Sequence, residues 1–206
     1  MKIKVCGMRD AQNISEVSEL QPDYMGFIFY PMSKRYVDGI ENDIFAPISS
    51  LIKKTGVFVN ESPQAIIEKA GIYHLQAVQL HGDEEPQTCE ILKSTGIEVI
   101  KAFGIDDTFD FNILEAYADK VDYFLFDTKT AGYGGSGKSF NWDVLDQYKL
   151  SVPYFLSGGL NPANIGMLSE IRDERFYAAD LNSGFETSPG IKNIIELKKA
   201  INLLRI

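Results

Sequence analysis

The stretch YFLSGGLNPANI, residues 154–165, contains the unit that decides the fold of this chain. Tyr154–Ser157 is an apolar run of strand length that stops at two glycines. Asn161 and Pro162 follow, and they offer a helix N-cap with proline at the first helical position. An apolar run, a glycine or polar break and an amphipathic segment recur in this order along the chain. The sequence therefore consists of repeated strand–helix units.

Eight apolar runs are predicted to be strands, and their alternation with helices predicts a parallel sheet, because a parallel crossover needs a connection of helix size. They are Ile3–Cys6, Met25–Phe29, Lys54–Val59, Ala77–His81, Glu98–Phe103, Tyr123–Asp127, Tyr154–Ser157 and Phe176–Leu181. Eight units in 206 residues give about 26 residues each, which is compact for a (β/α)₈ barrel of about 250 residues. No linker rich in Pro, Gly or Ser divides the chain, so we expect one α/β domain over residues 1–206, a TIM barrel with eight parallel strands. An open doubly wound sheet is the alternative.

Helix ends are predicted from capping residues. Ser62 and Pro63 begin a helix in the same way as Asn161 and Pro162, and Gly71 and Gly96 each close one. The last segment, residues 190–206, is amphipathic and is expected to form the final helix.

Composition narrows the class of protein. The net charge of −9 disfavours a nucleic-acid or anionic-membrane partner, because both require a basic surface. No apolar run approaches the roughly 20 residues that cross a bilayer, and lysines interrupt the N-terminus where a signal peptide would be apolar. We therefore expect a cytoplasmic protein with reduced cysteines, of which Cys89 is a small core residue within a helix. Cys6 and Cys89 are the only two cysteines that a disulfide could join.

Polar and glycine residues follow the predicted strands, at the end where a barrel carries its active site. They are Cys6-Gly7, Val59-Asn60, His81-Gly82, Asp127-Thr128, Ser157-Gly158-Gly159 and Asn182-Ser183-Gly184. The loops after strands seven and eight often bind phosphate in such barrels, and glycine lets backbone N–H groups approach an anion. We expect Gly158, Gly159, Ser183 and Gly184 to bind phosphate, the alternative being tight strand-to-helix turns.

Cys6 and Asp127 end strands that lie nearly opposite in an eight-stranded barrel. A thiol and a carboxyl facing each other across the mouth suit acid–base chemistry on a small substrate. The alternatives are a packed structural cysteine and an aspartate that caps its own loop. No metal is expected, because the two histidines, His74 and His81, have no cluster of ligands around them.

Eight collinear motifs resemble the phosphoribosylanthranilate isomerase family of tryptophan synthesis. They are KVCGMRD (4–10), GFIFYPMSKRYV (26–37), GVFVN (56–60), VQLHGDE (78–84), FLFDT (124–128), GGSGKSFNW (134–142), SGGLNPANI (157–165) and DLNSGFE (180–186). Lys34, Ser136 and Asn182 depart from the residues usual in the family. The resemblance implies a (β/α)₈ enzyme that needs no cofactor and isomerises a phosphorylated sugar–anthranilate substrate by an Amadori rearrangement. Whether the protein is a monomer or a homodimer stays open.

The resemblance also implies residue roles: Asp127 as general acid and Cys6 as general base. Arg35 is expected to bind the anthranilate carboxylate, and His81 to line the aromatic end of the pocket. Asp180 is expected to contact a ribose hydroxyl or to orient its loop. A free thiol has a pKa of about 8.5, so we expect a positive environment, from Arg9 or from local N–H groups, to lower the pKa of Cys6.

Two other functions are compatible with parts of the sequence. Residues 132–139, GYGGSGKS, match the P-loop pattern of nucleotide triphosphatases. Lys129, Thr130 and Ala131 stand directly before this motif, whereas a P-loop turns directly off its strand. The family resemblance interprets the segment as a mobile lid beside Asp127. The other alternative is a non-catalytic barrel that binds a phosphate-bearing ligand.

Overall fold

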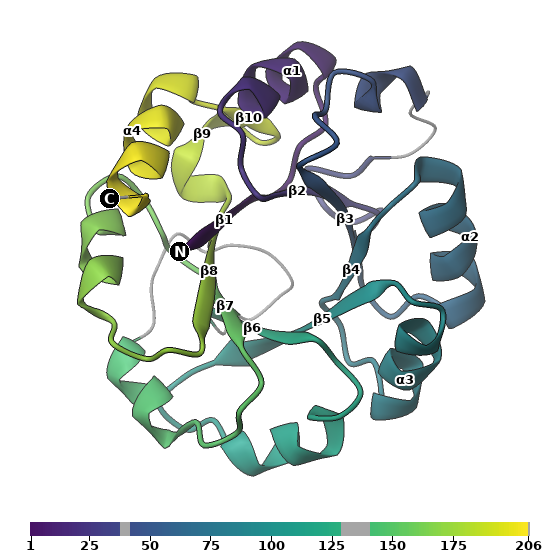
Figure 1. Ribbon diagram of the computed structural model, residues 1–206, viewed down its shortest axis with the longest axis vertical. Helices are drawn as coiled ribbons and strands as arrows, with labels where there is room; N and C mark the ends of the chain where they lie inside the picture. The colour runs from purple at the N-terminus through teal and green to yellow at the C-terminus, as the bar shows by residue number, and fades with distance from the viewer. Residues whose placement is uncertain (38–41, 129–140, 206) are drawn as a thin grey trace.

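Eight parallel strands form a closed barrel in the computed structural model, which describes residues 1–37, 42–128 and 141–205 (Figure 1). The strands follow one another around the barrel in chain order, and β8 pairs with β1 to close it. They are β1 (Lys2–Val5), β2 (Tyr24–Ile28), β3 (Lys53–Phe58), β4 (Ala77–Leu80), β5 (Glu98–Ile105), β6 (Tyr123–Thr128), β7 (Tyr154–Leu156) and β8 (Phe176–Leu181). The predicted barrel is confirmed, and the open sheet is wrong.

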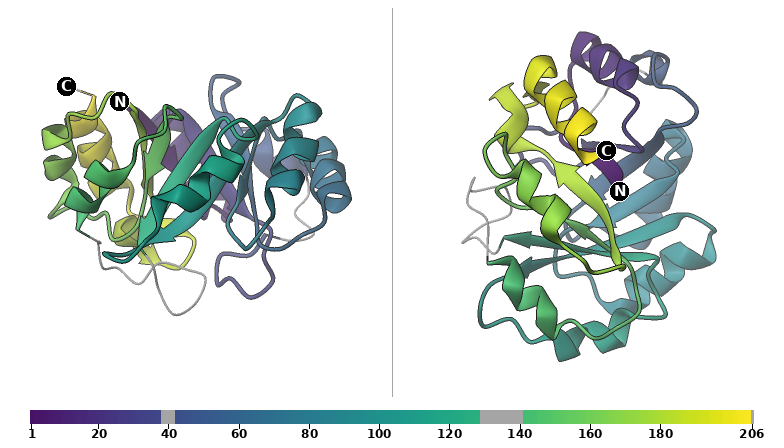
Figure 2. Two further views of the ribbon diagram at one scale, coloured as in Figure 1. Left: turned by 90° about the horizontal axis from the view of Figure 1, so that it is seen from below. Right: turned by 60° about the vertical axis from the view of Figure 1, so that its left-hand side comes forward.

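Closure joins the two ends of the sequence. In the β1–β8 register Lys4 lies opposite Asp180 and Val5 opposite Leu181. Both chain ends lie on the same side of the barrel (Figure 2), where Lys2 and Arg205 each form an ion pair with Asp23. Residues from the start and the end of the chain therefore meet in one wall.

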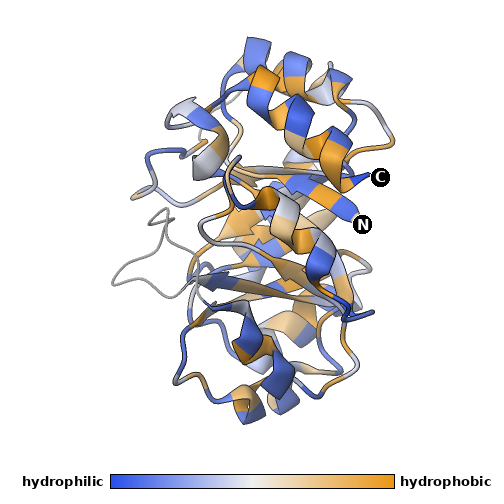
Figure 3. Cartoon of the chain, turned by 90° about the vertical axis from the view of Figure 1, so that its left-hand side faces the viewer, coloured by the Kyte–Doolittle hydropathy of each residue, from blue (hydrophilic) through white to orange (hydrophobic). Residues whose placement is uncertain are grey.

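Helices surround the barrel, but fewer of them are α-helical than the sequence predicts. Within the described residues the α-helices are α1 (Ala11–Glu19), α2 (Pro63–Tyr73), α3 (Pro86–Ser94) and α4 (Ile194–Leu204). The remaining connections contain 3₁₀ helices, which are η1 (Asn42–Phe45), η2 (Phe111–Tyr117), η3 (Trp142–Gln147), η4 (Ile165–Glu170) and η5 (Ser183–Phe185). Figure 3 shows hydrophobic and hydrophilic residues side by side along these helices. Among the described residues, no helix combines the length and the apolar character needed to cross a membrane.

The capping predictions are partly right. Ser62 caps α2 by accepting a hydrogen bond from the N–H of Ala65, and Gly96 follows α3 with a φ of +84°. Gly71 does not close a helix: α2 continues to Tyr73 and ends on His74 in the left-handed region. The helix predicted at Asn161 and Pro162 is also wrong.

Asn161 starts a turn instead of a helix. Its side chain accepts from the N–H of Ala163 and its carbonyl from the N–H of Ile165, and η4 begins only at Ile165. The capping side chain is present, but because of the turn the helix starts four residues after Asn161.

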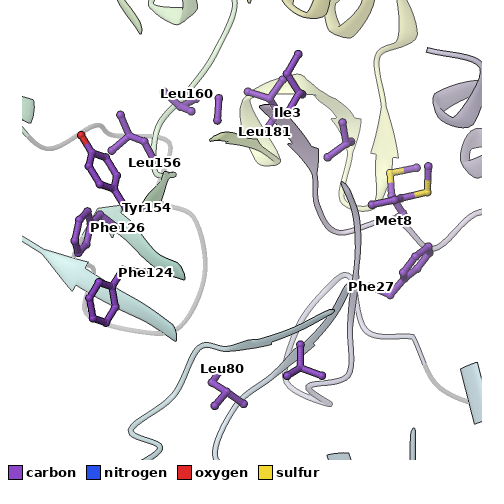
Figure 4. Close-up of a cluster of buried hydrophobic side chains, with 14 of the residues drawn as sticks. Ile3, Met8, Phe27, Leu80, Phe124, Phe126, Tyr154, Leu156, Leu160 and Leu181 are labelled. Carbon is purple, nitrogen blue, oxygen red and sulfur yellow. The ribbon is translucent and has the colours of Figure 1, made fainter. Parts of the chain in front are cut away.

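The strands are buried on both faces, and side chains alternate between two cores. Phe124 and Phe126 of β6 point toward the surrounding helices and join a large cluster with Tyr154 and Leu156 of β7 (Figure 4). Leu125, between them, faces the inside of the barrel. The inner apolar cluster fills the barrel near the N-terminal ends of the strands with the residues Tyr24, Ala77, Ile100, Ala102, Leu125, Phe155 and Ala178. Polar side chains are consequently left for the opposite end.

A short hairpin follows β8 and η5 and adds two strands outside the barrel. It consists of β9 (Glu186–Ser188) and β10 (Ile191–Lys192), which pair in antiparallel fashion around Gly190 at a φ of +87°. The N–H of Lys192 donates to Oδ1 of Asn13 on α1 at 2.7 Å, and Nδ2 of Asn13 donates back to the carbonyl of Lys192 at 3.1 Å. These bonds fix the end of the hairpin on the barrel.

Candidate active site

The C-terminal ends of the strands surround a pocket of about 760 Å³, its open mouth included. The residues predicted from the sequence that line it are Cys6, Arg35, His81, Asp127, Gly158, Gly159, Asp180 and Ser183. Gly184 is not among the lining residues. The structure thus brings eight of the nine predicted residues into one cavity.

Strand alternation explains why Cys6 and Asp127 reach this pocket. Cys6 directly follows β1 and Asp127 is the fifth residue of β6, and both have the parity that points into the barrel. In the closed order, β1 and β6 are separated by β7 and β8. The thiol and the carboxyl therefore enter the same cavity from different walls.

The sulfur of Cys6 occupies space left by a missing side chain. A Cβ on Gly26 of β2 would lie 2.7 Å from Sγ, closer than real Cβ atoms come to other heavy atoms. Cys6 is only 3% exposed, and it is a free thiol, as is the buried Cys89 of α3. Gly26 therefore keeps the wall of the pocket open for the thiol.

The expectation for the pKa of Cys6 is wrong in direction. Burial raises the pKa of the thiol above its ordinary value; the Lys4 ammonium opposes this, Asp180 adds to it, and Lys192 opposes it. Arg9 is not the source of positive charge, because its guanidinium donates at 2.8 Å to the carbonyl of Lys34 at an exposed position. The two cations that act most on the thiol are Lys4 and Lys192, for which the sequence predicted no role.

Lys4 and Asp180 form a buried ion pair next to Cys6. Nζ of Lys4 lies 2.7 Å from Oδ2 of Asp180, and their side chains are 0% and 4% exposed. Burial acts to lower the pKa of Lys4, but the charges and hydrogen bonds of Asp180 and Cys6 together outweigh it, so that the pKa is raised. Oδ1 of Asp180 is buried and has no hydrogen-bond partner among the described residues. This oxygen can accept a hydrogen bond from a ligand.

Asp127 is held by polar neighbours rather than by an apolar wall. Its Oδ1 accepts from the N–H of Thr128 at 2.8 Å, and its Oδ2 lies 3.4 Å from Nε2 of His81. Nε2 of Gln79 lies 2.7 Å from Nδ1 of the same ring. The two nitrogens of the His81 ring therefore each face one polar side chain, Gln79 at Nδ1 and Asp127 at Nε2. Phe124 and Phe126 point away, so the apolar run does not surround the carboxyl.

Arg35 is tied to Glu186 of the β9–β10 hairpin. Nε of Arg35 lies 2.8 and 3.1 Å from the two carboxylate oxygens, and Nη2 lies 2.6 Å from Oε2. Lys192 binds the same carboxylate at 2.7 Å and donates to Oδ1 of Asn182 at 2.8 Å. Burial acts to raise the pKa of Glu186, but the bonds from Arg35 and the charge of Lys192 outweigh it and lower that pKa. Burial lowers the pKa of Lys192, with Glu186 opposing.

The glycine loops have backbone conformations and contacts that leave no room for side chains. Gly158 and Gly159 have φ values of +86° and +67°, and a Cβ on Gly158 would lie 2.6 Å from Oδ1 of Asp127. The carbonyl of Gly159 accepts from the side-chain amides of Asn161 and Asn164 at 2.8 and 2.9 Å. A Cβ on Gly184 would collide with the carbonyl oxygen of Leu160. The loops after β7 and β8 are therefore packed directly against each other.

Four residues at this site were missed: Lys4, Gly26, Glu186 and Lys192. Lys4 can be predicted from the sequence, because it precedes Cys6 by two positions and therefore lies on the same face of the strand. Gly26 has the weaker signal of a glycine inside an apolar run. Glu186 and Lys192 depend on a hairpin that joins residues far apart in the sequence, and no local pattern indicates their contacts.

Two further expectations concern metal and nucleotide binding. The described residues contain no group of three or more His, Cys, Asp or Glu side chains that could hold a metal ion. The P-loop-like segment, residues 132–139, lies outside the described residues. His74 has a structural position as the C-cap of α2.

Known proteins match the chain over nearly its whole length. A family model described as N-(5'phosphoribosyl)anthranilate (PRA) isomerase matches residues 3–203. N-(5'-phosphoribosyl)anthranilate isomerase of Parabacteroides distasonis is 48% identical over 203 residues, which are 98% of this chain and 92% of the relative. The enzyme of the same name from Phocaeicola vulgatus is 44% identical over 205 residues, covering 100% of this chain and 98% of the relative.

Solved structures agree with the sequence matches. The crystal structure of phosphoribosyl anthranilate isomerase from Thermotoga maritima superposes with a TM-score of 0.87 at 35% identity, covering 100% of this chain and 98% of that one. A structure of the same enzyme type in complex with reduced 1-(o-carboxyphenylamino)-1-deoxyribulose 5-phosphate has a TM-score of 0.83 at 32% identity, with the same coverage. The chain belongs to the N-(5'-phosphoribosyl)anthranilate isomerase family.

Proposed function

We propose that the pocket at the barrel mouth carries out the reaction of the family with Asp127 as general acid and Cys6 as general base. The activity itself follows from family membership: the chain is a phosphoribosylanthranilate isomerase of tryptophan synthesis, an enzyme of the aldose–ketose isomerase type. The substrate is N-(5'-phosphoribosyl)anthranilate, and the product is 1-(o-carboxyphenylamino)-1-deoxyribulose 5-phosphate. The proposal therefore concerns only the roles of individual residues.

The first step opens the ribose ring. Asp127 gives a proton to the ring oxygen, the bond from C1 to that oxygen breaks, and the nitrogen lone pair forms a protonated imine with C1. The Asp127 carboxyl at the mouth of the barrel, with Nε2 of His81 3.4 Å from Oδ2, is placed to donate into the cavity. Proton donation by a positioned group typically accelerates such a step by about 10²–10⁴-fold.

The second step moves the double bond. The Cys6 thiolate takes the hydrogen from C2, and the electrons of that C–H bond form C1=C2 and neutralise the imine nitrogen. The resulting enolamine becomes the ketone when C1 gains a proton and the C2 hydroxyl loses one. The number of electrons in the sugar is unchanged, so the reaction needs neither an oxidant nor a cofactor.

The rest of the pocket suits the two ends of this substrate. Arg35 binds the anthranilate carboxylate, for which a guanidinium has matching geometry. Backbone N–H groups of Gly158, Gly159, Ser183 and Gly184 bind the phosphate. Oδ1 of Asp180, which has no partner among the described residues, accepts from a ribose hydroxyl. His81 lines the side of the pocket near Asp127.

One observation carries the proposal: Cys6 and Asp127 enter a single cavity from β1 and β6 in a chain of this family. The test is an isomerase assay of the wild type, Cys6→Ser and Asp127→Asn in parallel, with circular dichroism as a control for folding. Both variants are expected to lose about 10²–10⁴-fold in kcat with the fold intact. Full activity in either folded variant would remove that residue from the mechanism.

The same experiment addresses the non-catalytic alternative. A barrel that only binds a phosphate-bearing ligand would show no isomerase activity in the wild type while binding the product with normal affinity. Calorimetric titration with the product separates this outcome from an inactive preparation.

A further inference from the structure

Charged side chains surround Cys6 on several elements. Those on its own side of the pocket come from β1, the segment after β2, β8 and the β9–β10 hairpin, while β4 and β6 provide the groups on the other side. They are Lys4, Arg35, Asp180, Glu186 and Lys192, with His81 and Asp127 across the cavity. How these charges are paired decides the potential at the sulfur.

When these charged groups are paired, one positive charge has no carboxylate of its own. Lys4 and Asp180 form a one-to-one ion pair at 2.7 Å, which has no net charge. Glu186 accepts hydrogen bonds from both Arg35 and Lys192, so two cations share one carboxylate. Among the described residues no second carboxylate contacts Arg35 or Lys192 in the ion pairs of this structure. When both cations are protonated, the Arg35–Glu186–Lys192 group carries one positive charge more than it has negative charges.

Lys192 brings this charge close to Cys6. Its Nζ lies 2.8 Å from Oδ1 of Asn182, and that oxygen would lie only 2.7 Å from a Cβ on Gly7, the residue after Cys6. The N–H of Cys6 itself donates at 2.9 Å to the carbonyl of Leu181, the residue before Asn182. The side chain of Lys192 is 0% exposed, so water screens its charge weakly.

We propose that Lys192 is a positioning residue for Cys6: the positive charge that it adds to the Arg35–Glu186 pair stabilises the thiolate, the form in which Cys6 accepts a proton. The proposal rests on the proposed function, in which Cys6 is the general base. A buried thiolate is costly unless a cation compensates it. The substrate makes the need greater, because it brings the negative charges of a carboxylate and a phosphate into the same pocket.

The direction of the effect of Lys192 on the thiol agrees with this role. Burial raises the pKa of Cys6, and the two lysines, Lys4 and Lys192, both act to lower it. Lys4 is already matched by Asp180, which acts in the opposite direction. Lys4 acts more strongly on the thiol than Lys192, but Asp180 offsets it, whereas Lys192 belongs to a group in which two cations share one carboxylate.

The test measures the ionisation of Cys6 without substrate. The rate of alkylation by iodoacetamide is followed against pH, with the Cys6 peptide identified by mass spectrometry so that Cys89 does not contribute. The midpoint of the rate profile reports the thiolate, and the plateau at high pH reports access of the reagent. In Lys192→Met the midpoint is expected to move to higher pH by about one unit, which lowers the rate below the midpoint about tenfold.

Glu186→Gln provides the opposite change. It removes the shared carboxylate charge and keeps both cations, so its midpoint is expected to move to lower pH. Lys199→Met on α4 is the matched control, because it deletes the same charge from a side chain that is 67% exposed, and its midpoint should equal that of the wild type. A purely structural role would not produce shifts of opposite sign.

Two results would overturn the proposal: an unmoved midpoint in Lys192→Met, or a shift in the same direction in Lys192→Met and Glu186→Gln. If circular dichroism shows that Lys192→Met does not fold, Glu186→Gln decides alone, and a midpoint that does not fall rejects the idea. Failure here is distinct from failure of the proposed function. An inactive Cys6→Ser with unmoved midpoints rejects only the role of Lys192, whereas an active Cys6→Ser rejects Cys6 as the base.

Discussion

Gly26 lies against the sulfur of Cys6, and a Cβ on Gly26 would come within 2.7 Å of Sγ and 3.1 Å of the Cα of Cys6. Neither β1 nor β2 can shift easily to relieve this contact, because β2 is bonded to β3 along five residue pairs and β1 to β8 along four. The strand pair thus sets the position of the thiol to within a few tenths of an ångström.

Gly26→Ala is therefore expected to move the sulfur and to lower kcat/KM on the order of 10²-fold, the loss typical of a misplacement by about 1 Å. Gly71→Ala is the matched control: it lies in α2 with nothing within 4 Å of the added Cβ. That change is expected to stabilise the protein by about 0.5–1 kcal/mol and to leave kinetics unchanged. Steady-state kinetics and urea unfolding measure both, and wild-type kcat/KM in Gly26→Ala would contradict the argument.

Asp180→Ala is expected to lower the free energy of unfolding by about 3–5 kcal/mol, because it leaves the buried ammonium of Lys4 without its partner. Replacing both residues, as in Lys4→Met with Asp180→Leu, removes the uncompensated charge and should restore much of that loss. Urea denaturation of the two variants measures the difference. Equal destabilisation of single and double variants would show that the ion pair is not the cause.

Glu186 is expected to make stability depend on pH on the acid side. Its pKa is lowered in the folded protein from the ordinary 4.5, so its contribution is present above about pH 4.5 and is lost as pH falls through the folded value. In Glu186→Gln the group cannot titrate, and the fall of unfolding free energy below pH 4.5 should be shallower. Urea unfolding of both proteins at intervals from pH 3 to 7 compares the slopes; identical slopes would refute the expectation.

Arg35→Lys is expected to raise KM clearly and to lower the free energy of unfolding only a little. Lysine keeps the positive charge beside Glu186 but lacks the planar fork that contacts that carboxylate with two nitrogens at 2.6–3.1 Å. An increase of about tenfold in KM, with kcat changed less, is the outcome expected for a residue that binds the carboxylate end. A product analogue lacking the carboxylate should bind both proteins equally. If the analogue binds the two proteins with different affinities, Arg35 does not act through the carboxylate of the substrate.

Gly184→Ala is expected to weaken phosphate binding, because the new Cβ pushes the loop after β8 away from the carbonyl of Leu160 in the loop after β7. KM should rise about tenfold, and competitive inhibition by inorganic phosphate should weaken in parallel. Gly166→Ala in η4 is the control, since its nearest neighbour, a methyl group of Leu203, is at an ordinary 3.6 Å. A higher KM with unchanged inhibition by phosphate would show that Gly184 only shapes a turn and does not help to bind phosphate.

The barrel and most of the pocket could be predicted because both depend on local patterns. Apolar runs mark strands that are buried on both faces, and the residues that follow them collect at one end of a parallel barrel. Cys6, His81 and Asp127 share the cavity for this reason alone. Lys4 was within reach of the same reasoning, because a residue two positions before Cys6 must share its face of the strand.

The electrostatics of the thiol could not be predicted from local patterns. Arg9, the nearest arginine in sequence, turns away to the carbonyl of Lys34, while Lys192 reaches Asn182 from the far end of the chain. The segment that brings Lys192 there is a hairpin of two short strands in which Ile191 is the single apolar residue, so it lacks the periodicity of a buried element. Long-range contacts of this kind depend on the closed barrel.

Barrel closure between β1 and β8 has a consequence for synthesis on the ribosome. β1 is synthesised at the start of translation. One of its two neighbours, β8, consists of residues 176–181 and is synthesised much later. Until then β1 exposes an unpaired edge, and Cys6 lacks both Asp180 and Lys192. We therefore expect a fragment that ends before residue 176 to leave β1 without one of its two neighbours and the barrel unclosed.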